Sequence, residues 1–127
     1  IMKQEVKELL VQYQQGELDG VLVYQALAKL SPNESMKKAL LELAADEGRH
    51  AGILKKYTNK ILTPNDESAK MMEKMYKQYG NKIFERIVEA EEKGEKMYAP
   101  FINDIPEAKS MIEDELKHAK IARSFLD

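Results

Sequence analysis

Apolar side chains recur every three or four positions along most of the chain, which is the spacing of one face of an α-helix. Residues that favour turns and helix caps separate the stretches that carry this pattern. The pattern predicts helices over residues 2–30, 32–57, 64–79, 82–99 and about 105–125. We therefore expect an all-α protein.

Three short segments combine capping residues with a proline, a pattern typical of helix starts. They are Ser31-Pro32-Asn33-Glu34, Thr63-Pro64-Asn65-Asp66 and Asp104-Ile105-Pro106-Glu107. In the first segment Ser31 is the expected N-cap, and Glu34 would complete a capping box. Gly80-Asn81 is expected to end the helix over residues 64–79, whose methionine and tyrosine stripe is more typical of core or groove packing than of a cofactor site.

One six-residue motif occurs twice, as Asp46-Glu47-Gly48-Arg49-His50-Ala51 and as Asp114-Glu115-Leu116-Lys117-His118-Ala119. The chain has only two histidines, and each follows a motif glutamate by three positions, so each Glu–His pair shares one helix face. Both faces are otherwise apolar, where a charge is costly unless it is paired or bound to metal. Solvated Glu–His pairs are the alternative, but two copies on apolar faces favour ligands for Fe, Mn or Zn.

Two further glutamates interrupt apolar faces. Glu17 lies within the stripe of residues 2–30, and its alternative interpretation is a solvated side chain. Glu91 lies below a run of apolar residues on the inward face of residues 82–99, whereas Glu92 points away and Glu95 lies at the edge. Glu17 and Glu91 are therefore the predicted partners of the repeated motif.

These features repeat together, so the chain is interpreted as two copies of a helical hairpin. The first helix of each copy carries a glutamate, then a glycine three positions later and a tyrosine seven positions later: Glu17, Gly20 and Tyr24, then Glu91, Gly94 and Tyr98. The second helix carries the six-residue motif. Four carboxylates and two imidazoles are the ligand set of two metal ions in a four-helix bundle. Gly16 and Gly20 indicate either a close helix approach or loose packing.

Composition narrows the choice of function. The chain has 127 residues, which suits one domain. Its net charge of −2 argues against nucleic acid as a partner, and no apolar run approaches the ~18 residues of a membrane span. We also expect no signal peptide. The absence of cysteine excludes disulfides, thiolate zinc sites and Fe–S clusters, and it suits the cytoplasm.

On these residues the chain resembles rubrerythrin-like members of the ferritin-like diiron-carboxylate superfamily, and also ferritin-like domains fused to vacuolar-iron-transporter-type proteins. The resemblance implies one domain over residues 1–127, an all-α ferritin-like four-helix bundle with a helical crossover between helices two and three. The metal ligands that it implies are Glu17, Glu47, His50, Glu91, Glu115 and His118. Glu47 and Glu115 would bridge the metals. Tyr24 and Tyr98 would orient ligand carboxylates, with plain core packing as the alternative.

The resemblance also implies a cofactor of two iron ions (Fe2+/Fe3+), with Mn or Zn as substitutes, and a diiron oxidoreductase that reduces peroxide or O2 and oxidises Fe(II). The chain lacks the Cys-rich rubredoxin domain of rubrerythrins, and Gly94 stands where they carry an extra glutamate. Turnover would therefore need an external electron donor. A non-catalytic iron- or manganese-binding module for iron handling and a metal-free structural bundle remain alternatives. A homodimer is one expected assembly.

Overall fold

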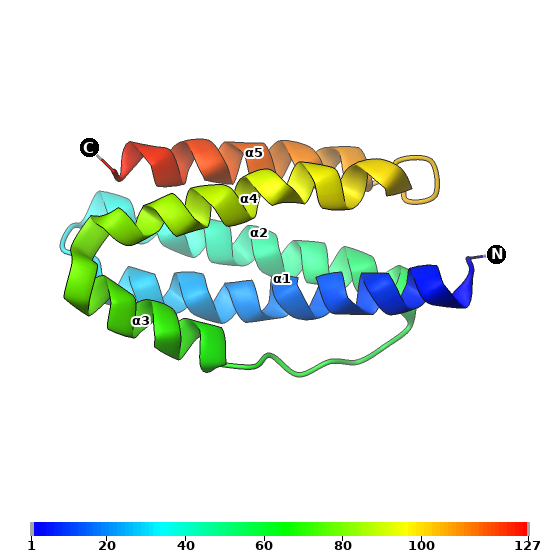
Figure 1. Cartoon of the computed structure of the whole chain (residues 1–127), viewed down its shortest axis with the longest axis horizontal. Coiled ribbons are helices and arrows are strands. Elements are labelled where there is room, and N and C mark those ends of the chain that lie inside the picture. The colour runs from blue at the N-terminus through cyan, green and yellow to red at the C-terminus, as the bar shows by residue number, and fades with distance from the viewer. Residues whose placement is uncertain (1, 127) are drawn as a thin grey trace. The chain divides into compact units, whose positions relative to one another are not determined.

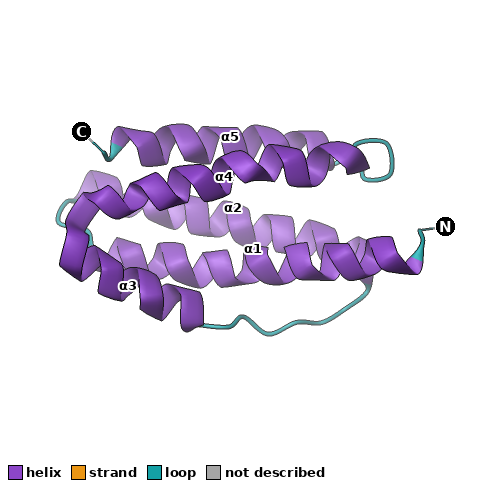
Figure 2. Cartoon of the chain, in the orientation of Figure 1, coloured by secondary structure: helices purple, strands orange, loops and turns teal. Residues whose placement is uncertain are grey.

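Residues 2–126, which the computed structural model describes, form helices joined by short turns and one longer loop (Figures 1 and 2). The α-helices are α1 (Gln4–Leu30), α2 (Glu34–Thr58), α3 (Glu67–Tyr79), α4 (Phe84–Tyr98) and α5 (Ala108–Ser124). Short 3₁₀ helices, Gly80–Ile83 and Ala99–Phe101, flank α4. The described residues contain no strand, so the all-α prediction is confirmed. The chain divides into two compact units, residues 1–74 and 75–127.

The first unit is built on a hairpin in which α1 and α2 run antiparallel, side by side (Figure 1). Each helix turns one apolar stripe toward the other, as the spacing predicted. The leucines that the fold buries completely or almost completely are Leu10, Leu27, Leu40, Leu43 and Leu54. Burying a leucine side chain contributes about 1.5–3 kcal/mol relative to leaving it exposed, so this stripe supplies much of the stability of the unit.

The start of α2 corrects one expectation. Its N-cap is Asn33, whose side-chain oxygen accepts a hydrogen bond from the Met36 backbone N–H at 2.7 Å. Ser31 instead ends α1, where its own N–H donates to Ala28 O. The Ser31 hydroxyl donates to Asn33 O within the turn, so it does not cap α2. The predicted Ser31 cap is therefore wrong, because a second capping residue follows two positions later.

Polar side chains of α1 hold the loop of residues 59–66 that follows α2. The hydrogen bonds join Gln14 Nε2 to Lys60 O at 3.0 Å, Gln15 Nε2 to Thr63 O at 2.9 Å and Asn65 N to Asp19 Oδ1 at 2.7 Å. Thr58 Oγ1 also donates to Gln14 Oε1 at 2.5 Å, and both side chains are buried. Because the loop continues to Asp66, α3 begins three residues later than predicted.

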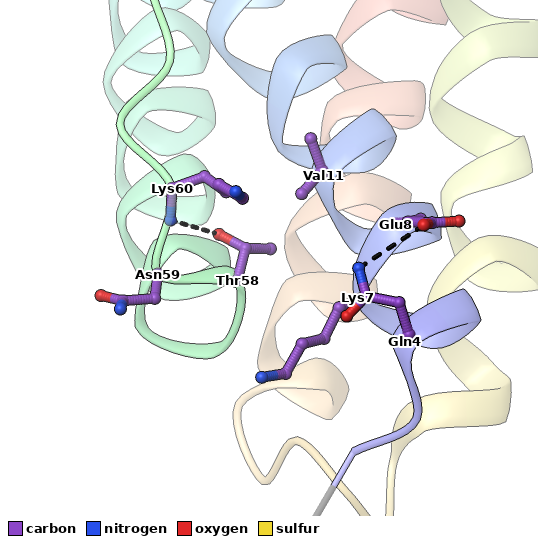
Figure 3. Close-up of a pocket in the computed structure, with 7 residues that line it drawn as sticks. All are labelled: Gln4, Lys7, Glu8, Val11, Thr58, Asn59 and Lys60. Atoms are coloured by element: carbon purple, nitrogen blue, oxygen red, sulfur yellow. Dashed lines mark hydrogen bonds between the residues drawn. The ribbon is translucent and has the colours of Figure 1, made fainter.

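A pocket lies in the first unit between the start of α1 and the end of α2 (Figure 3). The residues that line it are Gln4, Lys7, Glu8, Val11, Thr58, Asn59 and Lys60. Its charged side chains are two lysines and one glutamate, and none of the predicted metal ligands lines it. The pocket therefore has no part in the predicted metal chemistry.

The second unit is built on a hairpin of α4 and α5, which also run antiparallel (Figure 1). Phe84 is fully buried and makes edge-to-face contacts with Tyr76 and Phe125, with ring centroids 6.2 and 5.1 Å apart. The methionine and tyrosine stripe of α3 is only partly packed, since Met71 and Tyr79 are both 56% exposed. The expectation that this stripe fills a core or groove is therefore wrong for these two residues.

The connection between α4 and α5 corrects a second capping expectation. Asp104 does not cap α5: its N–H donates to Phe101 O, and the helix starts only at Ala108, with no side-chain cap. Backbone hydrogen bonds close this turn, including Ile105 N to Phe101 O at 2.7 Å. None of the helices formed by residues 2–126 combines the length and the hydrophobicity that crossing a membrane requires.

Candidate metal centre

The fold buries a small and specific set of ionisable side chains. Among residues 2–126, the buried acidic, basic and imidazole groups are Glu17, Glu47, His50, Glu91, Glu115 and His118. These are the six ligands that the sequence predicted. Glu92, the rejected neighbour of Glu91, is exposed and accepts a hydrogen bond from Arg123 at 2.8 Å. The helical periodicity therefore selected the buried carboxylates correctly.

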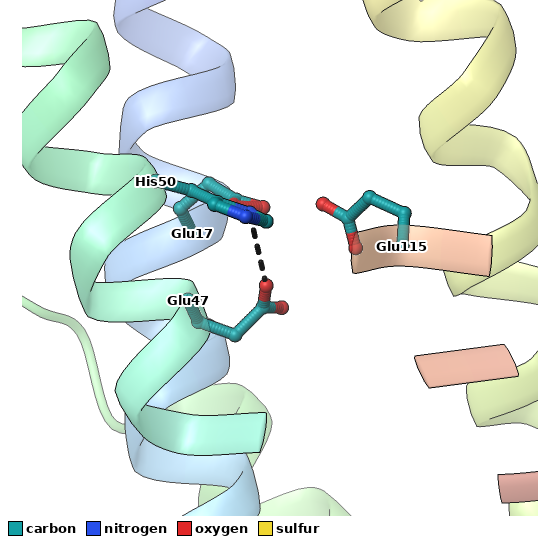
Figure 4. Close-up of side chains that lie close together, drawn as sticks. All are labelled: Glu17, Glu47, His50 and Glu115. Atoms are coloured by element: carbon teal, nitrogen blue, oxygen red, sulfur yellow. Dashed lines mark hydrogen bonds and ion pairs between the residues drawn. The ribbon is translucent and has the colours of Figure 1, made fainter. Parts of the chain in front are cut away.

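In the first hairpin, Glu17 comes from α1, and Glu47 and His50 come from α2; we call them the first trio (Figure 4). His50 Nδ1 lies 2.9 Å from Glu17 Oε2 and 3.7 Å from Glu47 Oε2. Each residue offers a ligand atom within 4.8 Å of the others. The i,i+3 spacing places Glu47 and His50 on one face, and the pairing of α1 with α2 adds Glu17 to it.

The second hairpin repeats this arrangement with Glu91 from α4 and Glu115 and His118 from α5, the second trio. His118 Nδ1 lies 3.4 Å from Glu91 Oε1 and 3.8 Å from Glu115 Oε2. Their ligand atoms also lie within 4.8 Å of one another. The sequence repeat therefore corresponds to a repeat in three dimensions.

The electrostatics of the second trio favour a bound cation. The pKa of Glu91 is raised from 4.5 to about 8, chiefly because the carboxyl is buried; His118 lowers this pKa, and the neighbouring Glu115 carboxyl raises it. Ionised Glu91 is thus costly in the metal-free protein, and a cation would remove that cost. Two carboxylates and one imidazole are donors that suit Fe, Mn or Zn, so each trio fits such an ion.

The predicted tyrosines lie in the interior of their units. Tyr24 is 3% exposed and Tyr98 is 1% exposed, each seven positions after the first glutamate of its hairpin. Their role in orienting ligand carboxylates stays a prediction. Sequence reasoning missed Gln14, a buried amide on α1; its three-residue spacing from Glu17 on the same stripe was the available signal.

Two helical hairpins, each burying a glutamate beside a Glu-x-x-His pair, define a helical protein with carboxylate and histidine groups that could hold metal. The family model of rubrerythrin matches residues 8–126. The chain belongs to the rubrerythrin family, whose members are diiron-carboxylate proteins with a ferritin-like four-helix bundle. No curated protein and no solved structure matches the chain.

Proposed function

We propose that the chain is a non-haem diiron oxidoreductase of rubrerythrin type, which reduces peroxide or O2 and oxidises Fe(II) as it does so. The observation that carries the proposal is that the acidic, basic and imidazole groups buried among the described residues are two trios of two carboxylates and one imidazole each. Four carboxylates balance the charge of two divalent ions. Family membership supports iron as the metal.

The two trios would hold the two ions. Their residues are Glu17, Glu47 and His50, and Glu91, Glu115 and His118. Glu47 and Glu115 are the proposed bridges, a role that the resemblance to rubrerythrins implies for the glutamate of each Glu-x-x-His pair. A bound iron pair would supply the two electrons that convert hydrogen peroxide and two protons into two molecules of water. The imidazoles hold their ring nitrogens toward carboxylates of the same hairpin, which limits their rotation.

Electrons for a second turnover would come from an external donor, since a chain without cysteine offers no thiolate redox centre of its own. The cytoplasm is the proposed compartment, because its reducing conditions suit such a chain. We further propose that residues 1–127 form a single domain and that the chain assembles as a homodimer. Mn or Zn would be the substitute metals.

Metal content tests the proposal first. Anaerobic titration with Fe(II) should saturate near two equivalents per chain. Glu91→Ala should bind one ion fewer, whereas the matched control Glu92→Ala should bind as the unmodified protein does, since Glu92 is exposed. Saturation at one equivalent or none, or a loss of metal in Glu92→Ala alone, would contradict the diiron assignment.

Oxidation kinetics test the chemistry. In stopped-flow experiments the Fe(II)-loaded protein should oxidise faster with peroxide than with O2, and continued turnover should need an added donor. His50→Ala and His118→Ala should each slow the reaction, because each removes an imidazole from one trio. Equally slow oxidation by both oxidants, with metal still tightly bound, would favour a non-catalytic iron- or manganese-binding module. The lack of a thiolate redox centre in this chain favours that second function.

A further inference from the structure

Gly20 lies against the Glu47 carboxylate in the first hairpin. A Cβ atom built on Gly20 would lie 2.9 Å from Glu47 Oε1 and 3.5 Å from both Cδ and Cγ of the same side chain. The other carboxylate oxygen, Oε2, lies 3.7 Å from His50 Nδ1. The Glu47 carboxylate therefore lies between His50 and the surface of α1 at Gly20, where the helix has no side chain. A methyl group on Gly20 would occupy part of the space that the carboxylate fills.

The second hairpin repeats the contact. A Cβ atom on Gly94 would lie 2.8 Å from Glu115 Cγ, 3.0 Å from Cβ and 3.2 Å from Cδ. Each of these glycines lies three residues after the first glutamate of its hairpin, opposite the glutamate of the Glu-x-x-His pair. Two other helical glycines, Gly16 and Gly52, have nothing within 4 Å of a built Cβ. The close approach is thus confined to the glycines that face the trios.

We propose that Gly20 and Gly94 are positioning residues for the metal centre, which keep the carboxylates of Glu47 and Glu115 in the side-chain conformation that metal binding uses. The inference rests on the proposed function. Glycine disfavours a helix, so its presence at the same register of α1 and α4 has a local cost that the placement of a ligand explains.

The two contacts differ in what must move when a methyl group is added. At Gly20 the nearest atom is the end of a flexible side chain, so the Glu47 carboxylate can rotate away while the helices stay in place. At Gly94 the nearest atoms are the stem of Glu115, next to the backbone, so the helices themselves must shift. Gly20→Ala is therefore the cleaner test, because it displaces a ligand oxygen without disturbing the fold.

The experiment compares the unmodified protein with Gly20→Ala and with the matched control Gly16→Ala, one turn away on α1. Anaerobic titration with Co(II), read from its visible absorption, and with Fe(II) measures affinity and ligand geometry. Gly20→Ala should weaken metal binding about 10- to 100-fold and change the Co(II) spectrum. Gly16→Ala should match the unmodified protein in both. The metal-free Gly20→Ala protein should melt no lower than the unmodified protein, since alanine favours the helix.

A double-mutant cycle tests whether Gly20 acts through Glu47. In a Glu47→Ala background, Gly20→Ala should cause no further loss of metal affinity, because the side chain that it displaces is absent. Three results would each overturn the inference. They are an equal loss of metal affinity in both backgrounds, an unchanged metal affinity in Gly20→Ala, and a melting temperature of metal-free Gly20→Ala well below that of the metal-free unmodified protein. If the unmodified protein binds no metal, both the proposed function and this inference fail. If every glycine variant binds metal as the unmodified protein does, only this inference fails.

Discussion

Replacing Glu91 by glutamine should remove the part of the pH dependence of stability that this buried carboxyl contributes in the metal-free protein. Glu91 is 4% exposed, and its pKa is raised by burial and by the neighbouring Glu115 carboxyl. Glutamine has the same shape and cannot ionise. Glu91→Gln therefore keeps the packing of α4 against α5 and deletes one titration.

The sign and size of the effect follow from the two pKa values. The pKa of glutamate is ordinarily 4.5, and that of Glu91 in the folded chain is about 8. Between these values the unfolded chain releases the proton while the folded chain retains it, so the free energy of unfolding falls as pH rises. Each pH unit in this interval costs about 1.4 kcal/mol, which amounts to about 5 kcal/mol at most by pH 8. Above that pH the contribution stops changing, because the carboxyl is ionised in both states.

Urea unfolding of chelator-treated protein at several values between about pH 5 and about pH 8 measures this loss. The unmodified protein should lose stability across the interval, and the difference between it and Glu91→Gln should grow with pH. Glu92→Gln is the matched control: it removes an exposed ion pair with Arg123, worth about 1 kcal/mol or less, and should retain the pH dependence. In the metal-loaded protein, Glu91 should no longer make the free energy of unfolding fall with pH, since a cation favours the ionised form of its carboxyl. Parallel curves for the unmodified protein and Glu91→Gln would refute the reasoning.

Two stability predictions concern packing and polar contacts. The free energy of unfolding of Gly94→Ala should be about 1–3 kcal/mol lower than that of the control Gly52→Ala, because the new methyl group meets the stem of Glu115 whereas Gly52 faces open space. Equal urea midpoints for the two variants would show that the contact relaxes freely. Thr58→Val should cost about 1–3 kcal/mol in the same assay, because it leaves the buried Gln14 carbonyl without its hydroxyl donor; an unchanged midpoint would mean that another donor replaces it.

Helical periodicity made much of the candidate site predictable from the sequence. Because side chains three or four apart share a face, the apolar residues around Glu91 place it inward and Glu92 outward, and the structure confirms both. The repeated hexapeptide predicted that both histidines of the chain would be buried, as they are. Helix starts were less predictable, since Ser31 and Asn33 both have capping side chains and the local sequence does not decide between them. The choice depends on which turn the chain makes between α1 and α2.

The sequence by itself determined which residues share a face with the apolar stripes, because that property depends only on helical geometry within one element. It therefore determined both Glu-x-x-His pairs and the glutamates that accompany them. Only the pairing of helices decided what lies opposite each position. Gly16 and Gly20 are both helical glycines one turn apart, yet Gly20 faces Glu47 and Gly16 faces open space. That difference arises from the packing of α2 on α1, so periodicity within α1 alone does not contain it.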